Sequence, residues 1–571
     1  MAEQVSCKMR ILSENYRDFI IGNERNLMLD GIDVKQVCEQ ELVQGYRGLY
    51  VEKELVEPMN LSKFSYSAIP NCYTLLDMEA MNQAGITRVQ NYPSLQLKGE
   101  GVLIGFLDTG IDYANPVFRN LDGTTRILGI WDQTIQTGVL PKGFDYGSAY
   151  SEEDINEALS LEDEQAQKER VPTEDTNGHG TFLSSIAAGG ADVENRFLGA
   201  APESTIAVVK LKEAKTYLKD YYFIKKDAVC YQENDIMAAI RYLDELAKEK
   251  NLPMVICVAL GSNLGGHNIT EPLAVALEAY AYHVGRAIVI GGGNEASQRH
   301  HFLGELKNDT DVKDVEIRVG NQELGFTMEL WTDIPNILAV SIVSPSGERI
   351  PRVPLRQTGS NVYRFVLEET VVYLDYKILV ERSNSELIVF RFDAPTAGIW
   401  KITVESVQIA DGIFHMWLPV SEFLTSDTYF LRSNPDYTIT GPGNAVSPMT
   451  VAFYDGVDNS IDIHSGRGYT RNERLKPNFA APGVNVLGAG KRGQFVRRTG
   501  SSIAAGITAG AAALLMEWIV YQLGYPDVDS TPIKNLLILG TVRSNTNTYP
   551  NREWGYGALN LYKTFDEIRQ Y

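Results

Sequence analysis

The sequence predicts an α/β protein: a parallel β-sheet with helices on both faces, plus a small α+β N-terminal region and an inserted all-β domain. Between residues 101 and 300, unbroken apolar runs alternate with segments of helical periodicity, a texture typical of a parallel sheet covered on both faces. From 302 to 430 this alternation gives way to short predicted strands separated by turn residues. At 571 residues, the chain is also longer than one hydrophobic core usually grows.

These changes in texture divide the chain into four stretches. We expect a small mixed region over residues 1–77 and the first part of the α/β core over 78–301. A β-sandwich or jelly roll then occupies 302–430, and the second part of the core occupies 431–571.

The core strands are predicted from apolar, β-branched runs at 101–108, 204–211, 253–261 and 286–293. In parallel sheets, chemistry collects at the carboxyl ends of such strands. The clearest helix covers 234–250, with Asn234 as its N-cap. Its apolar face is formed by Ile236, Ile240, Leu243 and Ala247.

Three more helices are expected. The acidic run 151–170 has helical spacing and a capping box from Ser151 to Asp154, which is typical of a solvated helix. The run 502–516 consists of small and apolar residues. It is shorter than the roughly 20 residues that a membrane span needs, so we expect it to pack inside the core. A final helix begins near Ser530.

Charge and cysteine content restrict the partners and the compartment. The 52 Lys and Arg against 73 Asp and Glu give a net charge of −21, which disfavours nucleic acid and anionic membranes. The N-terminus has no basic region followed by an apolar run, so we expect no signal peptide and a cytoplasmic location. An odd number of cysteines without CxxC spacing favours free thiols over a disulfide framework or a zinc site: Cys7, Cys38, Cys72, Cys230 and Cys257.

Three residues have side chains suited to acyl transfer. Asp108 ends an apolar strand, His179 lies between two glycines at the start of a predicted helix, and Ser502 opens the Ala-rich helix. Each also has a purely structural interpretation, as a turn aspartate, a structural histidine or an N-cap serine. None of the three is decisive by itself.

Together and in this order, the three segments resemble the motifs of the subtilisin-like (S8) serine protease family. Residues 108–110 are similar to its D-T/S-G motif, 179–181 to its H-G-T motif and 500–504 to its G-T-S-x-A motif. Further matches are Ala259-Leu260-Gly261 to the substrate-pairing strand, Gly292-Gly293-Asn294 to the oxyanion-hole segment and Ala481-Pro482-Gly483 to the A-P-G loop. The ordered set is more specific than any one short motif.

The resemblance implies a serine endopeptidase that acts on a protein or peptide substrate. Ser502 would be the nucleophile, His179 the general base and Asp108 the group that orients the imidazole. Asn294 and the Ser502 N–H would bind the oxyanion, although Gly-Gly-Asn is also an ordinary turn. No cofactor is implied. The loop 191–202 lacks the oxygen-ligand spacing of the family's calcium site, so no metal is predicted there.

The N-terminal region and the position of the all-β insert further resemble the Csp germination proteases of clostridial spores. That resemblance implies a prodomain that assists folding, is cut by the enzyme itself near Leu76 to Ala80, and stays bound in the active-site cleft. It also adds a spore compartment to the expected cytoplasmic location, and it suggests the zymogen of a spore-cortex hydrolase as a substrate.

Two departures from the family pattern flank the nucleophile and bear on rate: Ser501 replaces the usual Thr and Gly506 the usual Pro. Two alternatives to an active protease stay open. One is a pseudoprotease that acts as a signal receptor or scaffold. The other is an α/β binding protein in which Ser502 is an N-cap and His179 is structural. The latter requires the three side chains to lie out of hydrogen-bond reach of one another.

Overall fold

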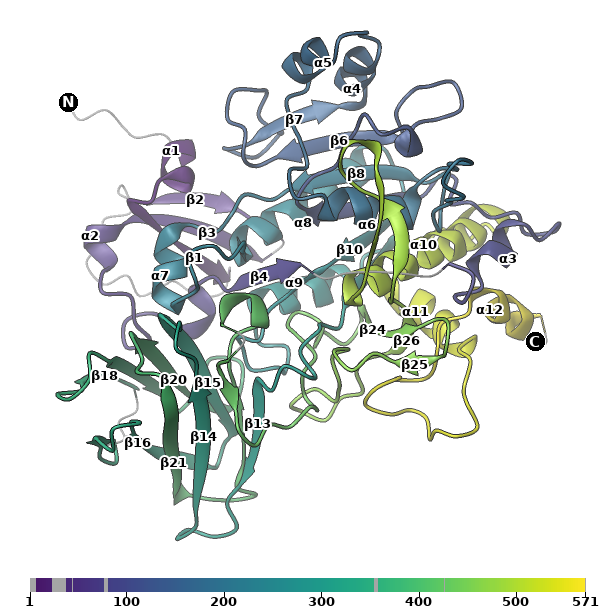
Figure 1. The fold of residues 1–571 in the computed structure, drawn as a ribbon. Helices are drawn as coiled ribbons and strands as arrows, with labels where there is room; N and C mark the ends of the chain where they lie inside the picture. Colours follow the sequence, from purple (N-terminus) through teal and green to yellow (C-terminus); the bar gives the residue numbers. More distant parts are fainter. Residues whose placement is uncertain are drawn as a thin grey trace, which may run out of the picture.

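Figure 1 shows the fold in a computed structural model. The structure describes residues 7–22, 37–43, 45–75, 81–353, 358–425 and 427–569. The predicted processing window, Leu76 to Ala80, lies outside the described residues.

A nine-stranded sheet in the order β25-β24-β12-β10-β5-β8-β6-β7, with β26 beside β24, forms the centre of the protein. Its inner strands run parallel, and β7 and β25 pair antiparallel with β6 and β24. The predicted α/β fold is therefore confirmed. The strands are β5 (Leu103–Asp108), β6 (Ile127–Asp132), β7 (Ser148–Ser151), β8 (Thr205–Lys210), β10 (Met254–Val258), β12 (Arg286–Gly291), β24 (Met449–Asp455), β25 (Ser460–Ile461) and β26 (Phe479–Pro482).

Helices cover both faces of this sheet because its strands are apolar on both faces. On β5, Ile104 and Phe106 join the core of α6 and α10, whereas Leu103 joins the core of α8 and α9 on the opposite face. The helices are α6 (His179–Ala188), α8 (Glu233–Glu249), α9 (Pro272–Tyr280) and α10 (Ser501–Glu517).

Two of the predicted helix boundaries are wrong. The N-cap of α8 is Gln232, and Asn234 lies in its first turn. The Asn234 side chain is occupied elsewhere, since it accepts from Gln232 and donates to Asp18. The acidic run 151–170 forms two helices, α4 (Glu152–Leu159) and α5 (Glu164–Arg170), because Asp163 caps the second by accepting from Ala166 N. The predicted capping box from Ser151 to Asp154 is confirmed.

The Ala-rich helix is longer than predicted. After α10 it continues as a π-helical turn, Trp518–Gln522. Glu517 does not end it, since its carboxylate accepts from the backbone N–H groups of Lys98 and Gly99 at 2.9 and 2.6 Å. By length and composition alone this 22-residue helix could cross a membrane, but 89% of its most apolar window is buried inside the protein. The helix predicted near Ser530 is α11 (Ser530–Leu539); α12 (Leu561–Ile568), which follows it, was not predicted.

The N-terminal region forms a separate antiparallel sheet in the order β1-β3-β2, at the left of Figure 1. Its elements are α1 (Cys7–Leu12), β1 (Tyr16–Gly22), β2 (Cys38–Glu41), β3 (Tyr46–Glu52) and α2 (Lys53–Val56). The expectation of free thiols is wrong for Cys7 and Cys38, which form a disulfide with their Cα atoms 5.5 Å apart. The pair was missed because 31 residues separate its members. Cys230 and Cys257 are free and buried.

The inserted β domain consists of two antiparallel sheets, in the orders β13-β22-β15-β20-β19-β18 and β17-β16-β21-β14-β23, that enclose one apolar core. Figure 1 shows it projecting at the lower left. Its strands are β13 (His301–Glu305), β14 (Val312–Val319), β15 (Gly325–Asp333), β16 (Ile337–Val343), β17 (Arg349–Ile350), β18 (Thr358–Arg364), β19 (Val371–Lys377), β20 (Ser385–Asp393), β21 (Gly398–Gln408), β22 (Ile413–Trp417) and β23 (Tyr429–Phe430).

Three buried histidines lie where this insert meets the core. His301 Nε2 and His415 Nδ1 are 3.0 Å apart, and the His267 ring stacks on Trp417 with ring centres separated by 4.1 Å. Burial lowers the pKa of His267 to about 4 and that of His301 to about 3, and it lowers the pKa of His415 well below its ordinary value. The cluster is therefore neutral at pH 7.

We expect acid to destabilise the protein through this cluster. Each histidine takes up a proton near pH 6.5 when unfolded but resists it when folded. Its contribution is therefore complete above pH 6.5 and is lost as the pH falls towards 4, by about 3 kcal/mol for His267. Urea unfolding at pH 7, 6 and 5 measures this slope. Replacing His415→Gln should make the slope shallower than in the parent protein. Equal slopes in the parent and the variant would contradict this assignment.

Candidate active site

The structure brings Asp108, His179 and Ser502 together. His179 Nδ1 lies 2.8 and 2.9 Å from the two Asp108 carboxylate oxygens, and His179 Nε2 lies 3.2 Å from Ser502 Oγ. All three residues are at most 2% exposed. The purely structural interpretation required these side chains to lie apart, and they do not.

Local backbone geometry places each of the three side chains. Asp108 is the last residue of β5, His179 the first of α6, and Ser502 lies in the first turn of α10. A Cβ on Gly180 would lie 2.2 Å from the Gly110 carbonyl oxygen, so only glycine lets α6 approach the loop that follows Asp108.

Asp175 fixes the start of α6, and the sequence analysis missed it. One of its carboxylate oxygens accepts from Gly178 N at 2.7 Å and from Thr109 Oγ1 at 2.8 Å. The other accepts from Thr181 N and Oγ1 at 2.8 and 2.7 Å. This buried carboxylate therefore joins the His179 segment to the Asp108 segment. An aspartate just before a Gly-flanked helix start was the available signal.

We expect Asp175→Ala to impair activity by displacing His179. The change leaves buried N–H groups unsatisfied, at a cost of about 1–3 kcal/mol each. A shift of the imidazole by about 1 Å should lower kcat about 100-fold. Since the hydrogen bonds of Asp175 go to Thr109, Gly178 and Thr181 and not to the predicted substrate residues 259–261, KM should stay near its original value. Steady-state kinetics and urea unfolding measure both effects.

The control for this change is Asp163→Ala, which removes a similar helix cap on exposed α5. It should lower stability by about 1 kcal/mol and leave kcat unchanged. A fall in kcat of the same size in both variants would contradict the positioning role of Asp175.

Asn294 and the two departures from the family pattern lie around the first turn of α10. Asn294 Oδ1 accepts from Ser501 N at 3.0 Å, which leaves its Nδ2 group for another acceptor. Ser501 Oγ accepts from Gly293 N at 3.0 Å, so serine supplies the hydroxyl that threonine would. A Cβ on Gly506 would lie 2.9 Å from Leu183 and Ile186 of α6. Gly506 thus lets the helices that carry His179 and Ser502 pack closely.

An extended segment of the N-terminal region pairs with the strand end to which the sequence assigns the substrate. Strand β4 (Cys72–Leu75) lies between β11 (Leu260–Gly261) and β9 (Tyr231–Gln232). Both pairings are antiparallel, with Leu75 opposite Leu260 and Thr74 opposite Gly261. The predicted strand 253–261 is thus divided at Ala259 into β10 and β11. The backbone edge assigned to a substrate carries the chain's own β4.

The other predicted substrate residues, Gly292 and Gly293, directly precede Asn294. The Gly292 N–H donates to the Val451 carbonyl, and the Gly292 carbonyl accepts from Thr440 N. The backbone of Gly292 therefore makes its hydrogen bonds within the fold. Cβ atoms on Gly261 and Gly293 would lie 2.5 and 2.7 Å from Thr440 side-chain atoms. Thr440, which the sequence analysis missed, therefore fills the space between these two glycines. Among the described residues no group of three or more His, Cys, Asp or Glu could hold a metal ion.

Comparisons with known proteins agree with this geometry. The model of the subtilase family matches residues 99–372 and 425–557. The structure of the Clostridium perfringens CspB protease superposes with a TM-score of 0.75 at 30% identity, covering 86% of this chain and 98% of that one.

Two curated bacterial proteases also match. The C5a peptidase of Streptococcus pyogenes serotype M18 is 23% identical over 499 residues, 82% of this chain and 40% of the relative. The PII-type proteinase of Lacticaseibacillus paracasei is 21% identical over 573 residues, 90% of this chain and 28% of the relative. The chain thus spans less than half the length of these curated relatives.

Proposed function

Because the chain belongs to the subtilase family and is a serine-type endopeptidase, we propose that it cuts its own N-terminal region at the active site and then activates a protein zymogen by limited proteolysis. The observation that carries the first step is the position of β4, which pairs with β11, the strand predicted to bind the substrate, and with β9.

The proposed chemistry follows from the contacts of the three side chains. Ser502 Oγ attacks the scissile carbonyl and passes its proton to His179 Nε2, while Asp108 accepts from Nδ1 and stabilises the imidazolium. The oxyanion is stabilised by Asn294 Nδ2 and by the Ser502 N–H, which lies at the start of α10 and has no partner within the helix. His179 then returns the proton to the leaving amine, and water releases the acyl group from Ser502 by the same route.

Retention of the N-terminal region after cleavage is supported by its contacts with the core and the insert. Asp18 is fully buried, accepts from Lys215 Nζ at 2.5 Å, and also accepts from Gln232 Nε2 at 2.6 Å. Tyr66 OH donates to Glu329 of the insert at 2.8 Å. Because these contacts do not involve the bond that is cut, the cleaved region should stay bound in the cleft.

The proposed zymogen substrate and spore compartment rest on the similarity to the CspB protease. The cytoplasmic location stays a prediction from the sequence. The second candidate function is a signal receptor or scaffold without catalytic activity. The assembled triad favours the protease, since the hydrogen bonds that activate a serine would have no role in a scaffold.

Mass spectrometry of the purified full chain tests the proposal. The expected result is two fragments that stay associated, with the new N-terminus after one of the residues 76–80. A fluorophosphonate probe should label Ser502 in the same preparation. An uncut chain that the probe does not label would instead favour the receptor or scaffold.

A further inference from the structure

A basic pocket lies at the edge of the central sheet opposite the active site. Its volume is about 580 Å³, within the range of small-molecule sites. It opens next to Asn478, which directly precedes β26, and beside α11. Asp108, in contrast, is the last residue of β5 and so lies at the carboxyl end of this parallel strand. The pocket therefore takes no part in the proposed proteolysis.

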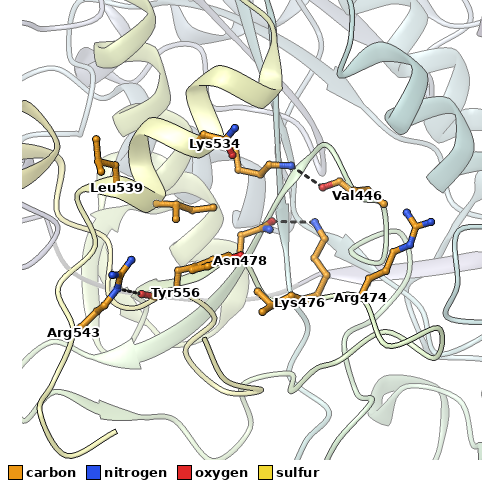
Figure 2. Close-up of a pocket in the computed structure, with 11 residues that line it drawn as sticks. Val446, Arg474, Lys476, Asn478, Lys534, Leu539, Arg543 and Tyr556 are labelled. Atoms are coloured by element: carbon orange, nitrogen blue, oxygen red, sulfur yellow. Dashed lines mark hydrogen bonds between the residues drawn. The ribbon is translucent and has the colours of Figure 1, made fainter. Parts of the chain in front are cut away.

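Four cations line the pocket, and its lining includes no acidic residue. Lys534 and Lys476 reach it from the walls, and Arg474 and Arg543 lie on opposite sides in Figure 2. Within the described ranges none of the four forms an ion pair with a carboxylate. In a chain of net charge −21, this is an unusual concentration of positive charge.

Two of these cations are buried, which makes the missing counter-charge costly. Lys476 is 2% exposed and donates only to uncharged oxygens, those of Pro448, Thr450 and Asn478, at 2.8 to 3.0 Å. Lys534 is 7% exposed and donates to the Val446 and Ser447 carbonyls. Buried charges in proteins are ordinarily paired.

The surroundings of the two lysines do not compensate for this charge. Burial lowers the pKa of Lys476 well below its usual value, with Lys534 adding to the effect, and burial also lowers the pKa of Lys534. Glu278 acts on both lysines and Asp529 on Lys534, but among the described residues neither forms an ion pair with them. The Glu278 oxygens accept from Ser447 N and Oγ at 2.8 and 2.6 Å, and Asp529 accepts from Thr531 N at 2.8 Å. An anion inside the pocket would supply the charge that the protein does not.

The remaining lining is largely apolar, with Val446, Leu475, Ile538, Leu539 and the Tyr556 ring. We propose that this pocket binds a small organic anion, with its acidic group among Lys534, Arg474 and Arg543 and an apolar body against these side chains. Lys476 would contribute only its positive charge, because its three N–H groups already donate to protein oxygens and none is left for the ligand. Lys534 donates two protons to carbonyls and keeps one for the ligand.

Calorimetric titration of the full chain at pH 7.5 and low salt tests the site with three probes. Octanoate has both the charge and the apolar body, octanamide lacks the charge, and acetate lacks the apolar body. We expect octanoate to bind at least tenfold more tightly than either of the others. Equal binding of octanoate and octanamide would overturn the proposal.

Variants assign the binding to this pocket. The exposed pair Arg474→Gln with Arg543→Gln should weaken octanoate binding at least tenfold and leave the thermal midpoint near that of the parent protein. Lys534→Met, which keeps the apolar stem, should weaken it as well. Arg364→Gln, an exposed arginine on the insert, is the matched control and should bind as the parent does. If the double variant at Arg474 and Arg543 binds octanoate as tightly as the parent, the anion lies elsewhere and the proposal is wrong.

Discussion

Ser502→Ala is expected to abolish both peptide hydrolysis and N-terminal processing, with kcat lowered about 10⁶-fold. The side chain makes one contact with the triad, 3.2 Å from His179 Nε2, and lies at the start of a helix that packs through its other residues. Alanine therefore removes the nucleophile with little effect on the fold. The measurements are hydrolysis of a peptide substrate and the mass of the N-terminal fragment.

The neighbouring serine provides the control. Ser501→Ala removes only the acceptor of Gly293 N, so the variant should still process itself, though more slowly. Full-length Ser502→Ala protein should remain uncut through purification. If its N-terminal region is cleaved at the same bond as in the parent, another protease makes the cut, and self-processing is excluded.

The core of the fold was predictable because its signals are local. Strands buried on both faces are unbroken apolar runs, and β5, β8 and β12 lie where such runs were read. The triad side chains follow directly from these elements, since Asp108 ends a strand and His179 and Ser502 begin helices. The residue types of the triad and the ends of the elements that carry them could therefore both be predicted from the sequence.

The features that the sequence did not reveal depend on contacts between distant segments. Strands β9 and β11 have two residues each, too few for any periodicity, and they exist because β4 lies between them. The basic pocket likewise gathers α11 and the segment before β26, so that Lys476 and Lys534 meet only in the folded chain. Asp175 is an intermediate case, since its cap motif was visible but its link to Thr109 was not.

The second large effect is expected from Asp108→Asn, which should lower kcat about 10⁴-fold and leave KM nearly unchanged. The Asp108 carboxylate faces His179 Nδ1 with both oxygens, and that contact holds the proton on Nδ1 so that Nε2 is free to accept from Ser502. An amide can turn its NH₂ group toward Nδ1, which favours the opposite tautomer and places a proton on Nε2. The serine then has no base, although the volume of the side chain is unchanged.

A neighbouring strand supplies the matched control for this variant. Asp132 also ends a parallel strand, is also fully buried, and accepts from Thr134 and Thr173, but it does not contact His179. Asp132→Asn should therefore cost stability in urea unfolding while the folded protein keeps its kcat. Both changes exchange a buried carboxylate for an amide at the end of a β-strand. Of the two residues only Asp108 contacts His179, whereas Asp132 pairs with Lys210 Nζ at 3.2 Å. A similar loss of kcat in both variants would mean that buried charge, and not control of the imidazole tautomer, accounts for the effect at Asp108.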